Sequence, residues 1–136
     1  MLSKRAKYAL KALLAVAKDS SGIPIPARQI ALSENIPGKF LEAILHDLSK
    51  AAILKSERGI HGGYTLRRAP SEIQVAEVMR IMDGPIALIP CVSENFYEKC
   101  DECHDEATCH IRKLFGEVRE EMLTVLNQTV ADLLKK

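Results

Sequence analysis

Residues 26–48 read Pro26-Ala-Arg-Gln-Ile30-Ala-Leu-Ser-Glu-Asn35-Ile-Pro-Gly-Lys-Phe40-Leu-Glu-Ala-Ile-Leu45-His-Asp-Leu48. The first part has a short helical face of alanines and Ile30 that ends near Glu34. A turn over residues 35–38 follows, because proline and glycine interrupt a helix there. Residues 39–51 then predict a second helix, since apolar residues recur at i, i+3, i+4 and i+7: Leu41, Ile44, Leu45 and Leu48. Two short helices joined by a tight turn are typical of a helix-turn-helix.

The segments on both sides extend this motif. An amphipathic helix is expected over residues 3–18, with one apolar face formed by Leu10, Leu13, Leu14 and Ala17. Residues 53–56 and 64–66 read as short strands, and the glycines between them permit a tight hairpin. A helix-turn-helix followed by a hairpin is a winged helix.

A further helix is expected from Val75, and it ends at the breaker Asp83-Gly84-Pro85. The last helix is expected over residues 108–126. Its apolar positions step by three, four, four and three residues: Ile111, Leu114, Val118, Met122 and Val125. This spacing is a coiled-coil-like seam of about two heptads and favours a homodimer. The alternative is that the face packs on its own domain.

The charge of the chain is divided between its halves. Residues 1–70 carry 12 Lys and Arg against 5 Asp and Glu, whereas residues 71–136 carry 7 against 13. The first half therefore has a net charge of +7 and the second of −6, so the basic half is suited to the phosphates of double-stranded DNA. We find no signature of a catalytic triad or nucleotide loop, and we expect no enzyme activity.

The N-terminus superficially resembles a signal peptide, with Lys4-Arg5 before an apolar run. However, Lys7 and Lys11 interrupt that run, and the apolar residues have helical spacing. We therefore expect a structural helix, a cytoplasmic protein and no association with a membrane.

Three residues at the start of the second helix of the motif are candidates to read DNA bases, because that end of a recognition helix enters the major groove. Lys39 can meet a phosphate or a guanine edge, and Glu42 can accept a hydrogen bond from a cytosine amino group. Phe40 is expected either to touch a thymine methyl group or to pack in the core.

Other basic residues are expected to contact DNA outside the recognition helix. Arg58 and His61 lie on the wing, and an arginine at a wing tip commonly enters a narrow minor groove. A further group is expected to contact phosphates, which supplies affinity without reading sequence: Lys4, Arg5, Lys7 and Arg28.

All cysteines of the chain fall in one short acidic segment: Cys91, Cys100, Cys103 and Cys109. Four thiolates suit an iron–sulfur cluster, either 2Fe-2S or 4Fe-4S, or a tetrahedral zinc ion. Structural zinc sites commonly use two Cys-x-x-Cys pairs, and this segment has one, which favours a cluster. The remaining alternatives are metal-free thiols or a disulfide switch. Cys109 is expected at a helix N-terminus, where the helix dipole stabilises a thiolate.

Taken together, these motifs resemble the winged-helix family of bacterial regulators that includes the iron–sulfur regulator IscR, the nitric-oxide sensor NsrR, the iron regulator RirA and the cysteine regulator CymR. The resemblance covers nearly the whole chain. It rests on Lys7-Tyr-Ala-Leu10, residues 36–48, the wing Arg58-Gly-Ile-His-Gly-Gly-Tyr64, Val75-Ala-Glu-Val78 and the cysteines. It implies a homodimer that binds a partly palindromic operator, and a cluster held before the dimerisation helix by three cysteines and a variable fourth ligand.

Within this resemblance, Cys91, Cys103 and Cys109 match the family's three cysteines best. The fourth ligands used elsewhere in the family are missing, because Lys7 stands near the position of an aspartate and Arg112 stands at that of a histidine. Cys100 is the expected replacement, with two histidines in reserve: His104 and His110.

We therefore expect a mainly α fold with a small β wing. It comprises a winged helix-turn-helix domain over residues 1–84, a cysteine-rich cluster-binding loop over residues 85–109, and a dimerisation helix with a C-terminal tail over residues 110–136. The expected function is a homodimeric transcriptional regulator whose operator affinity depends on an iron–sulfur cluster that senses iron, oxygen, nitric oxide or redox state. The alternatives are a DNA-binding protein with structural zinc or a thiol switch, and a cluster carrier or electron-transfer protein.

Overall fold

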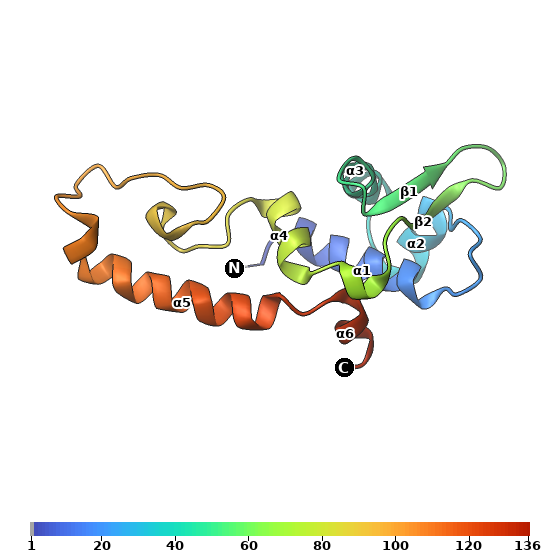
Figure 1. Ribbon diagram of the computed structural model, residues 1–136. Helices are drawn as coiled ribbons and strands as arrows, with labels where there is room; N and C mark the ends of the chain where they lie inside the picture. The colour runs from blue at the N-terminus through green and yellow to red at the C-terminus, as the bar shows by residue number, and fades with distance from the viewer. Residues whose placement is uncertain (1) are drawn as a thin grey trace.

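A computed structural model describes residues 2–136, and it places a winged helix at one end of the molecule and a long arm at the other (Figure 1). The chain runs through α1 (Lys4–Lys18), α2 (Ala27–Glu34), α3 (Gly38–Lys50), β1 (Leu54–Glu57), β2 (Gly63–Leu66), η1 (Pro70–Glu72), α4 (Val75–Asp83), η2 (Pro90–Val92), η3 (Glu106–Thr108), α5 (His110–Leu126) and α6 (Val130–Leu134). The mainly α fold with a small β wing is confirmed.

The first helix forms where its apolar spacing predicts it. Ser3 caps α1, because its hydroxyl oxygen accepts a hydrogen bond from the amide of Ala6 at 3.0 Å. The buried face of α1 is unusually small in volume, since three alanines and two larger residues make it up: Ala6, Ala9, Ala12, Leu13 and Val16. Small residues let α3 and α4 approach the axis of α1 closely.

The turn between α2 and α3 has the geometry that the sequence requires. Asn35 ends α2 in the left-handed conformation, with φ of 55°, a region that Asn tolerates better than most residues. The amide of Ile36 donates to the carbonyl of Ala31 at 2.9 Å, and Ile36 is buried. Pro26 and Pro37 stand just before the helices, as caps, and not within the first turns.

The wing is a two-stranded antiparallel sheet in which Leu54 pairs with Leu66 and Glu57 with Gly63. Ile25 adds a bridge to the sheet, because it exchanges two backbone hydrogen bonds with Tyr64, of 3.0 and 2.9 Å. Gly63 makes this approach possible: its φ is 152°, and a Cβ atom there would stand 2.4 Å from the carbonyl of Ile25.

The main core lies between α1, α3 and the base of the wing. Its fully buried large side chains are all aliphatic: Leu13, Ile30, Leu41, Ile44, Leu45, Leu48, Ile53, Leu54, Ile73, Val78 and Val130. One of these comes from the C-terminal tail, for which the sequence predicted no helix. Val130 is in α6, which Thr129 and Asp132 begin with a reciprocal capping box.

Backbone hydrogen bonds fix this return of the chain. The amide of Val130 donates to Ile73 and the amide of Val75 donates to Gln128, both at 2.9 Å. The last residues therefore pack beside α1, as Figure 1 shows, and are part of the winged-helix core.

A second small core joins α5 to α4. Leu123 is buried with Ala76 and Ile86, and Met79, Met122 and Leu126 pack against them. Met122, which the sequence assigns to the dimer seam, thus contacts its own chain. The first half of α5 extends away from the winged helix together with the cysteine loop (Figure 1). Among residues 2–136, no helix is long and apolar enough to cross a membrane.

Candidate functional site

The start of α3 and the neighbouring surface of α2 form a groove of about 560 Å³. Three residues from the sequence prediction line it together, namely Arg28 of α2 and Lys39 and Glu42 of α3. All three are exposed, so their charged ends are available to a ligand. The groove has two cations and one carboxylate, which suits phosphates beside a base edge with an amino group.

Phe40 is neither packed in the core nor fully free of its own domain. Its ring meets that of Tyr8 edge to face, with centroids 5.6 Å apart and planes at 88°. It nevertheless stays exposed over nearly half of its surface. The contact with α1 therefore holds a ring that still faces outward from the recognition helix.

At the turn of the wing, three exposed side chains flank Gly59, one before it and two after it, and the φ of Gly59 is 104°. Arg58 and His61 are among them, as predicted. The third exposed residue near them is Ile60, which is 97% exposed. Sequence reasoning missed Ile60, although its place between glycines at a hairpin tip is a signal for exposure.

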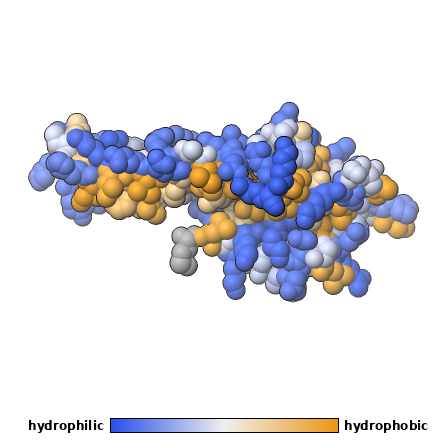
Figure 2. All heavy atoms as spheres, turned by 90° about the horizontal axis from the view of Figure 1, so that it is seen from below, coloured by the Kyte–Doolittle hydropathy of each residue, from blue (hydrophilic) through white to orange (hydrophobic). Residues whose placement is uncertain are grey.

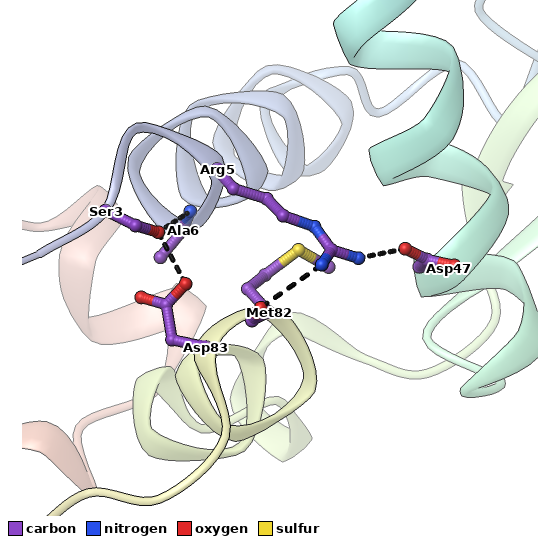
Figure 3. Close-up of polar contacts among 6 residues, drawn as sticks. All are labelled: Ser3, Arg5, Ala6, Asp47, Met82 and Asp83. Atoms are coloured by element: carbon purple, nitrogen blue, oxygen red, sulfur yellow. Dashed lines mark hydrogen bonds and ion pairs between the residues drawn. The ribbon is translucent and has the colours of Figure 1, made fainter.

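Arg5, which the sequence predicts to contact phosphates, has polar partners within its own chain. Its guanidinium pairs with Asp47 of α3 and donates to the carbonyl of Met82 at the end of α4, at 3.3 Å (Figure 3). Next to it, the hydroxyl of Ser3 donates to Asp83. Arg5 thus ties α1, α3 and α4 together, because all three helices converge at its position.

The four cysteines line one cavity of about 690 Å³ between the cysteine loop and the start of α5. Two of them stand on secondary structure. Cys91 lies in η2 and is 8% exposed, and Cys109 is the residue before α5. The sulfur of Cys109 accepts a hydrogen bond from the amide of Arg112 at 3.4 Å, so Cys109 caps the helix at the N-terminal position that the sequence predicted.

The other two cysteines stand on the loop itself. The amide of Cys103 donates to the carbonyl of Cys100 at 3.1 Å, which closes a turn at the Cys-x-x-Cys pair. The thiol of Cys100 is exposed and donates to Glu102 at 3.0 Å. This hydrogen bond raises the pKa of the Cys100 thiol and lowers the pKa of the Glu102 carboxyl.

The donor set of the cavity suits an iron–sulfur cluster, but the donors are spread around its wall. Within residues 2–136, no three Cys, His, Asp or Glu side chains converge closely enough to hold a metal ion. Residues 94–105 contain no helix or strand, so Cys100 and Cys103 are held only by the loop. Of the reserve ligands, His104 lines the cavity, whereas His110 does not.

One side-chain contact closes the base of this loop. The phenol of Tyr97 donates to the carboxylate of Glu106, which lies in η3. The hydrogen bond raises the pKa of Tyr97, because the neutral phenol is the donor. This hydrogen bond therefore joins the two ends of residues 98–105, the segment that contains Cys100 and Cys103.

A charged cluster links the loop to both neighbouring helices. Glu94 pairs with Arg119 of α5 at 2.8 Å and with Arg80 of α4 at 3.7 Å. Arg119 also pairs with Glu120. Glu94 is only three residues beyond Cys91, so this end of the loop is in direct contact with α4 and α5.

Comparisons with known proteins agree with this geometry. The Rrf2 family, described as iron-dependent transcriptional regulators, matches residues 2–136. An rrf2-like HTH-type transcriptional regulator of Rhodobacter capsulatus is 44% identical over 138 residues, which cover 98% of this chain and 92% of that protein.

Solved structures give the same result. The structure of CymR, the global cysteine regulator of B. subtilis, has a TM-score of 0.80 at 27% identity and covers 99% of this chain and 96% of its own. The structure of IscR from T. potens has a TM-score of 0.77 at 25% identity, with coverage of 99% and 86%. The similarity extends over the winged helix, the cysteine loop and α5.

Proposed function

The chain belongs to the Rrf2 family of transcriptional regulators and is not an enzyme, and on this premise we propose that it is a homodimeric regulator whose operator affinity is set by an iron–sulfur cluster. The observation that carries the proposal is the shared cavity of four thiols beside α5, at the far end of the molecule from the wing. The cluster is the sensor, and the winged helix is the part that reads DNA.

The groove and the wing support DNA binding. Arg28, Lys39 and Glu42 line one groove, in which the two cations would contact phosphate oxygens and Glu42 would accept a hydrogen bond from a cytosine. A carboxylate repels phosphates, so the presence of Glu42 in this groove favours a role in reading a base. Arg58 and His61 on the wing would then reach an adjacent minor groove.

The exposed face of α5 supports a homodimer. Ile111, Leu114 and Val125 are 63, 55 and 60% exposed, respectively, although they are apolar. Figure 2 shows apolar side chains gathered along the arm of the molecule. Pairing two copies of α5 would bury them and place two recognition helices on one operator, as a palindromic site requires.

The cysteines would hold the cluster from two sides. Cys91 and Cys109 are fixed by η2 and α5, whereas Cys100 and Cys103 belong to the exposed loop. A bound cluster would supply iron and sulfide that react with oxygen, nitric oxide or competing iron ligands. Because half of the donors are on the loop, binding of the cluster must draw that loop toward α5.

A movement of the cysteine loop toward α5 would be transmitted to the recognition helix α3 through contacts with α4. Glu94 connects the loop to Arg80 of α4, and α4 packs on α1 and α3. Regulation also requires that the cluster bind one DNA-binding state more tightly than the other. The sensed signal would act by changing the population of these states.

The decisive experiment measures iron, acid-labile sulfide and zinc in protein purified without oxygen, followed by operator titrations of cluster-loaded and cluster-free protein. Near-equal iron and sulfide, with different operator affinities for the two forms, support the proposal. Equal affinities contradict the coupling. Zinc alone indicates a structural metal, and a cluster without binding to promoter DNA indicates a carrier.

A thiol switch is the second candidate function. It is supported by the four free thiols, which line one cavity and of which Cys100 is exposed. In this case metal-free protein would change its operator affinity on oxidation, and mass spectrometry would identify a disulfide. Unchanged affinity after oxidation of metal-free protein excludes this candidate.

A further inference from the structure

Two cavities meet at the start of α5. The larger is lined by the four cysteines, and the smaller, of about 380 Å³, lies beneath Ser93 and Glu94. Only Cys91 and Arg112 line both cavities. Their side chains therefore form the wall between the thiols and the smaller pocket.

The side chain of Arg112 has no polar partner among residues 2–136. Its Nε atom is buried without a hydrogen bond, and its guanidinium forms no ion pair there. Arg119, two turns further along α5, has a buried Nε as well, but its terminal nitrogens pair with Glu94 and Glu120. The Nε atom of Arg68 is also buried without a partner, but a terminal nitrogen of Arg68 pairs with Glu77 at 2.6 Å. Of these three arginines within residues 2–136, Arg112 alone has no ion pair. A buried donor without an acceptor is costly, and a ligand in the thiol cavity would supply the acceptor.

The charge around the larger cavity shows what that ligand requires. Four carboxylates line the cavity with the thiols: Glu98, Asp101, Glu102 and Asp105. The cations in its lining are Lys99, on the exposed loop, and Arg112, on the helix. Four thiolates would add further negative charge, so an added electron is unfavourable there unless a cation offsets it.

We infer that Arg112 is the positioning residue that retains the iron–sulfur cluster and raises its reduction potential, by directing guanidinium N–H groups at the thiolate sulfurs. The inference rests on the proposed cluster. Arginine has five N–H donors and no acceptor, so Arg112 serves as a donor to the ligands and not as a ligand itself. A fourth thiolate adds one negative charge to the site, and Arg112 brings one positive charge to the same wall.

The test compares full-length Arg112→Ala, Arg112→Lys and Lys113→Ala with the wild type. Lys113 is the matched control, because it is the adjacent cation on α5 and lines the smaller cavity but not the thiol cavity. Each protein is loaded with iron and sulfide without oxygen. Its midpoint potential is measured by spectroelectrochemistry, and its cluster retention by the decay of absorption in the presence of a chelator.

Arg112→Ala is expected to lower the midpoint potential and to weaken cluster retention by about 10- to 100-fold, the range for outer-shell partners of metal ligands. Arg112→Lys is expected to give a midpoint potential and a cluster retention between those of Arg112→Ala and the wild type, because lysine preserves the charge but not the forked donor. Lys113→Ala is expected to match the wild type.

Two outcomes overturn the inference in different ways. If Arg112→Ala and Lys113→Ala both match the wild type, Arg112 has no role toward the cluster, while the proposed function stands. If the wild type takes up no iron and sulfide, the inference and the proposed cluster fail together. Circular dichroism monitors folding, and Arg112→Lys provides the comparison should Arg112→Ala not fold.

Discussion

Glu94 and Arg119 form an ion pair of 2.8 Å that holds the cysteine loop against α5. The other carboxylate oxygen of Glu94 lies 3.7 Å from Arg80 of α4. One side chain thus connects the cysteine loop, the arm and the winged helix. Because α4 packs on α1 and α3, this contact lies between the candidate sensor and the recognition helix.

Replacing Glu94 with glutamine is expected to reduce the dependence of operator affinity on the cluster. Glu94 is half exposed, so the change should alter overall stability by about 1 kcal/mol or less. The measurement is the ratio of operator Kd values for cluster-free and cluster-loaded protein, by fluorescence anisotropy. Glu120→Gln is the control, because Glu120 pairs with Arg119 but not with α4. If the ratio of operator Kd values in Glu94→Gln equals that of the wild type, Glu94 does not couple the cluster to operator affinity.

Glu42 and Lys39 are expected to affect DNA binding differently, although both line the same groove. Glu42→Ala should relax specificity at one base pair by about 1–3 kcal/mol, because a base contact is lost. Lys39→Ala should weaken binding to all sequences and lower the slope of log K against log salt by about 1. Titrations against operator variants at several salt concentrations separate the two effects. Identical behaviour of the variants would refute this assignment.

The apolar face of α5 is expected to hold the homodimer together. Ile111→Glu places a charge among exposed apolar side chains, which would have to be desolvated on association. We expect monomers in light scattering after size exclusion, together with weaker operator binding. Thr124→Glu introduces the same charge at an exposed position away from the apolar seam of α5, and it should remain dimeric. A dimeric Ile111→Glu would show that the interface lies elsewhere.

Cys100 is expected to be a ligand despite its exposure. Cys100→Ser should fold normally, since the side chain is exposed, but should hold less iron and sulfide because serine is a poor ligand for the cluster. The measurement is iron and sulfide per chain, with a thermal melt of the cluster-free protein as the control for folding. Full cluster content in Cys100→Ser would leave His104, which lines the same cavity, as the candidate fourth ligand.

The return of the C-terminus is expected to stabilise the winged helix. Val130 is fully buried, so Val130→Ala should lower the free energy of unfolding by roughly 2 kcal/mol. Urea denaturation measures this change. Leu134→Ala, at the exposed end of α6, should cost much less. Equal effects of the two variants would mean that α6 does not belong to the core.

Local pattern was sufficient to predict most helices and the wing. The spacing of Leu41, Ile44 and Leu48 predicts one buried face, and that face is buried. This cause acts within a few residues along the chain, so the sequence alone displays it. The need for glycine at position 63 has a different origin, because it is set by the backbone of Ile25, which is distant in the sequence and approaches only in the folded chain.

Other features depend on residues that are far apart in the sequence. The charge of Arg5 predicts a phosphate contact, but its position among α1, α3 and α4 gives it Asp47 and the carbonyl of Met82 as partners. No local pattern distinguishes an arginine that contacts only phosphates from one that also pairs with groups of its own chain. Likewise, the short apolar run in α6 has no signal for burial until Ile73 and Gln74 approach it.

The candidate site shows the same division. The sequence by itself determined the four candidate thiols, the helix-turn-helix and the basic half, because these depend on residue identity and spacing. Only the tertiary structure decided that Cys91 is buried, that Glu94 joins two helices, and that Arg112 shares a cavity wall with the thiols. The physical reason is that burial and pairing arise from contacts between distant segments, which form when the whole chain packs.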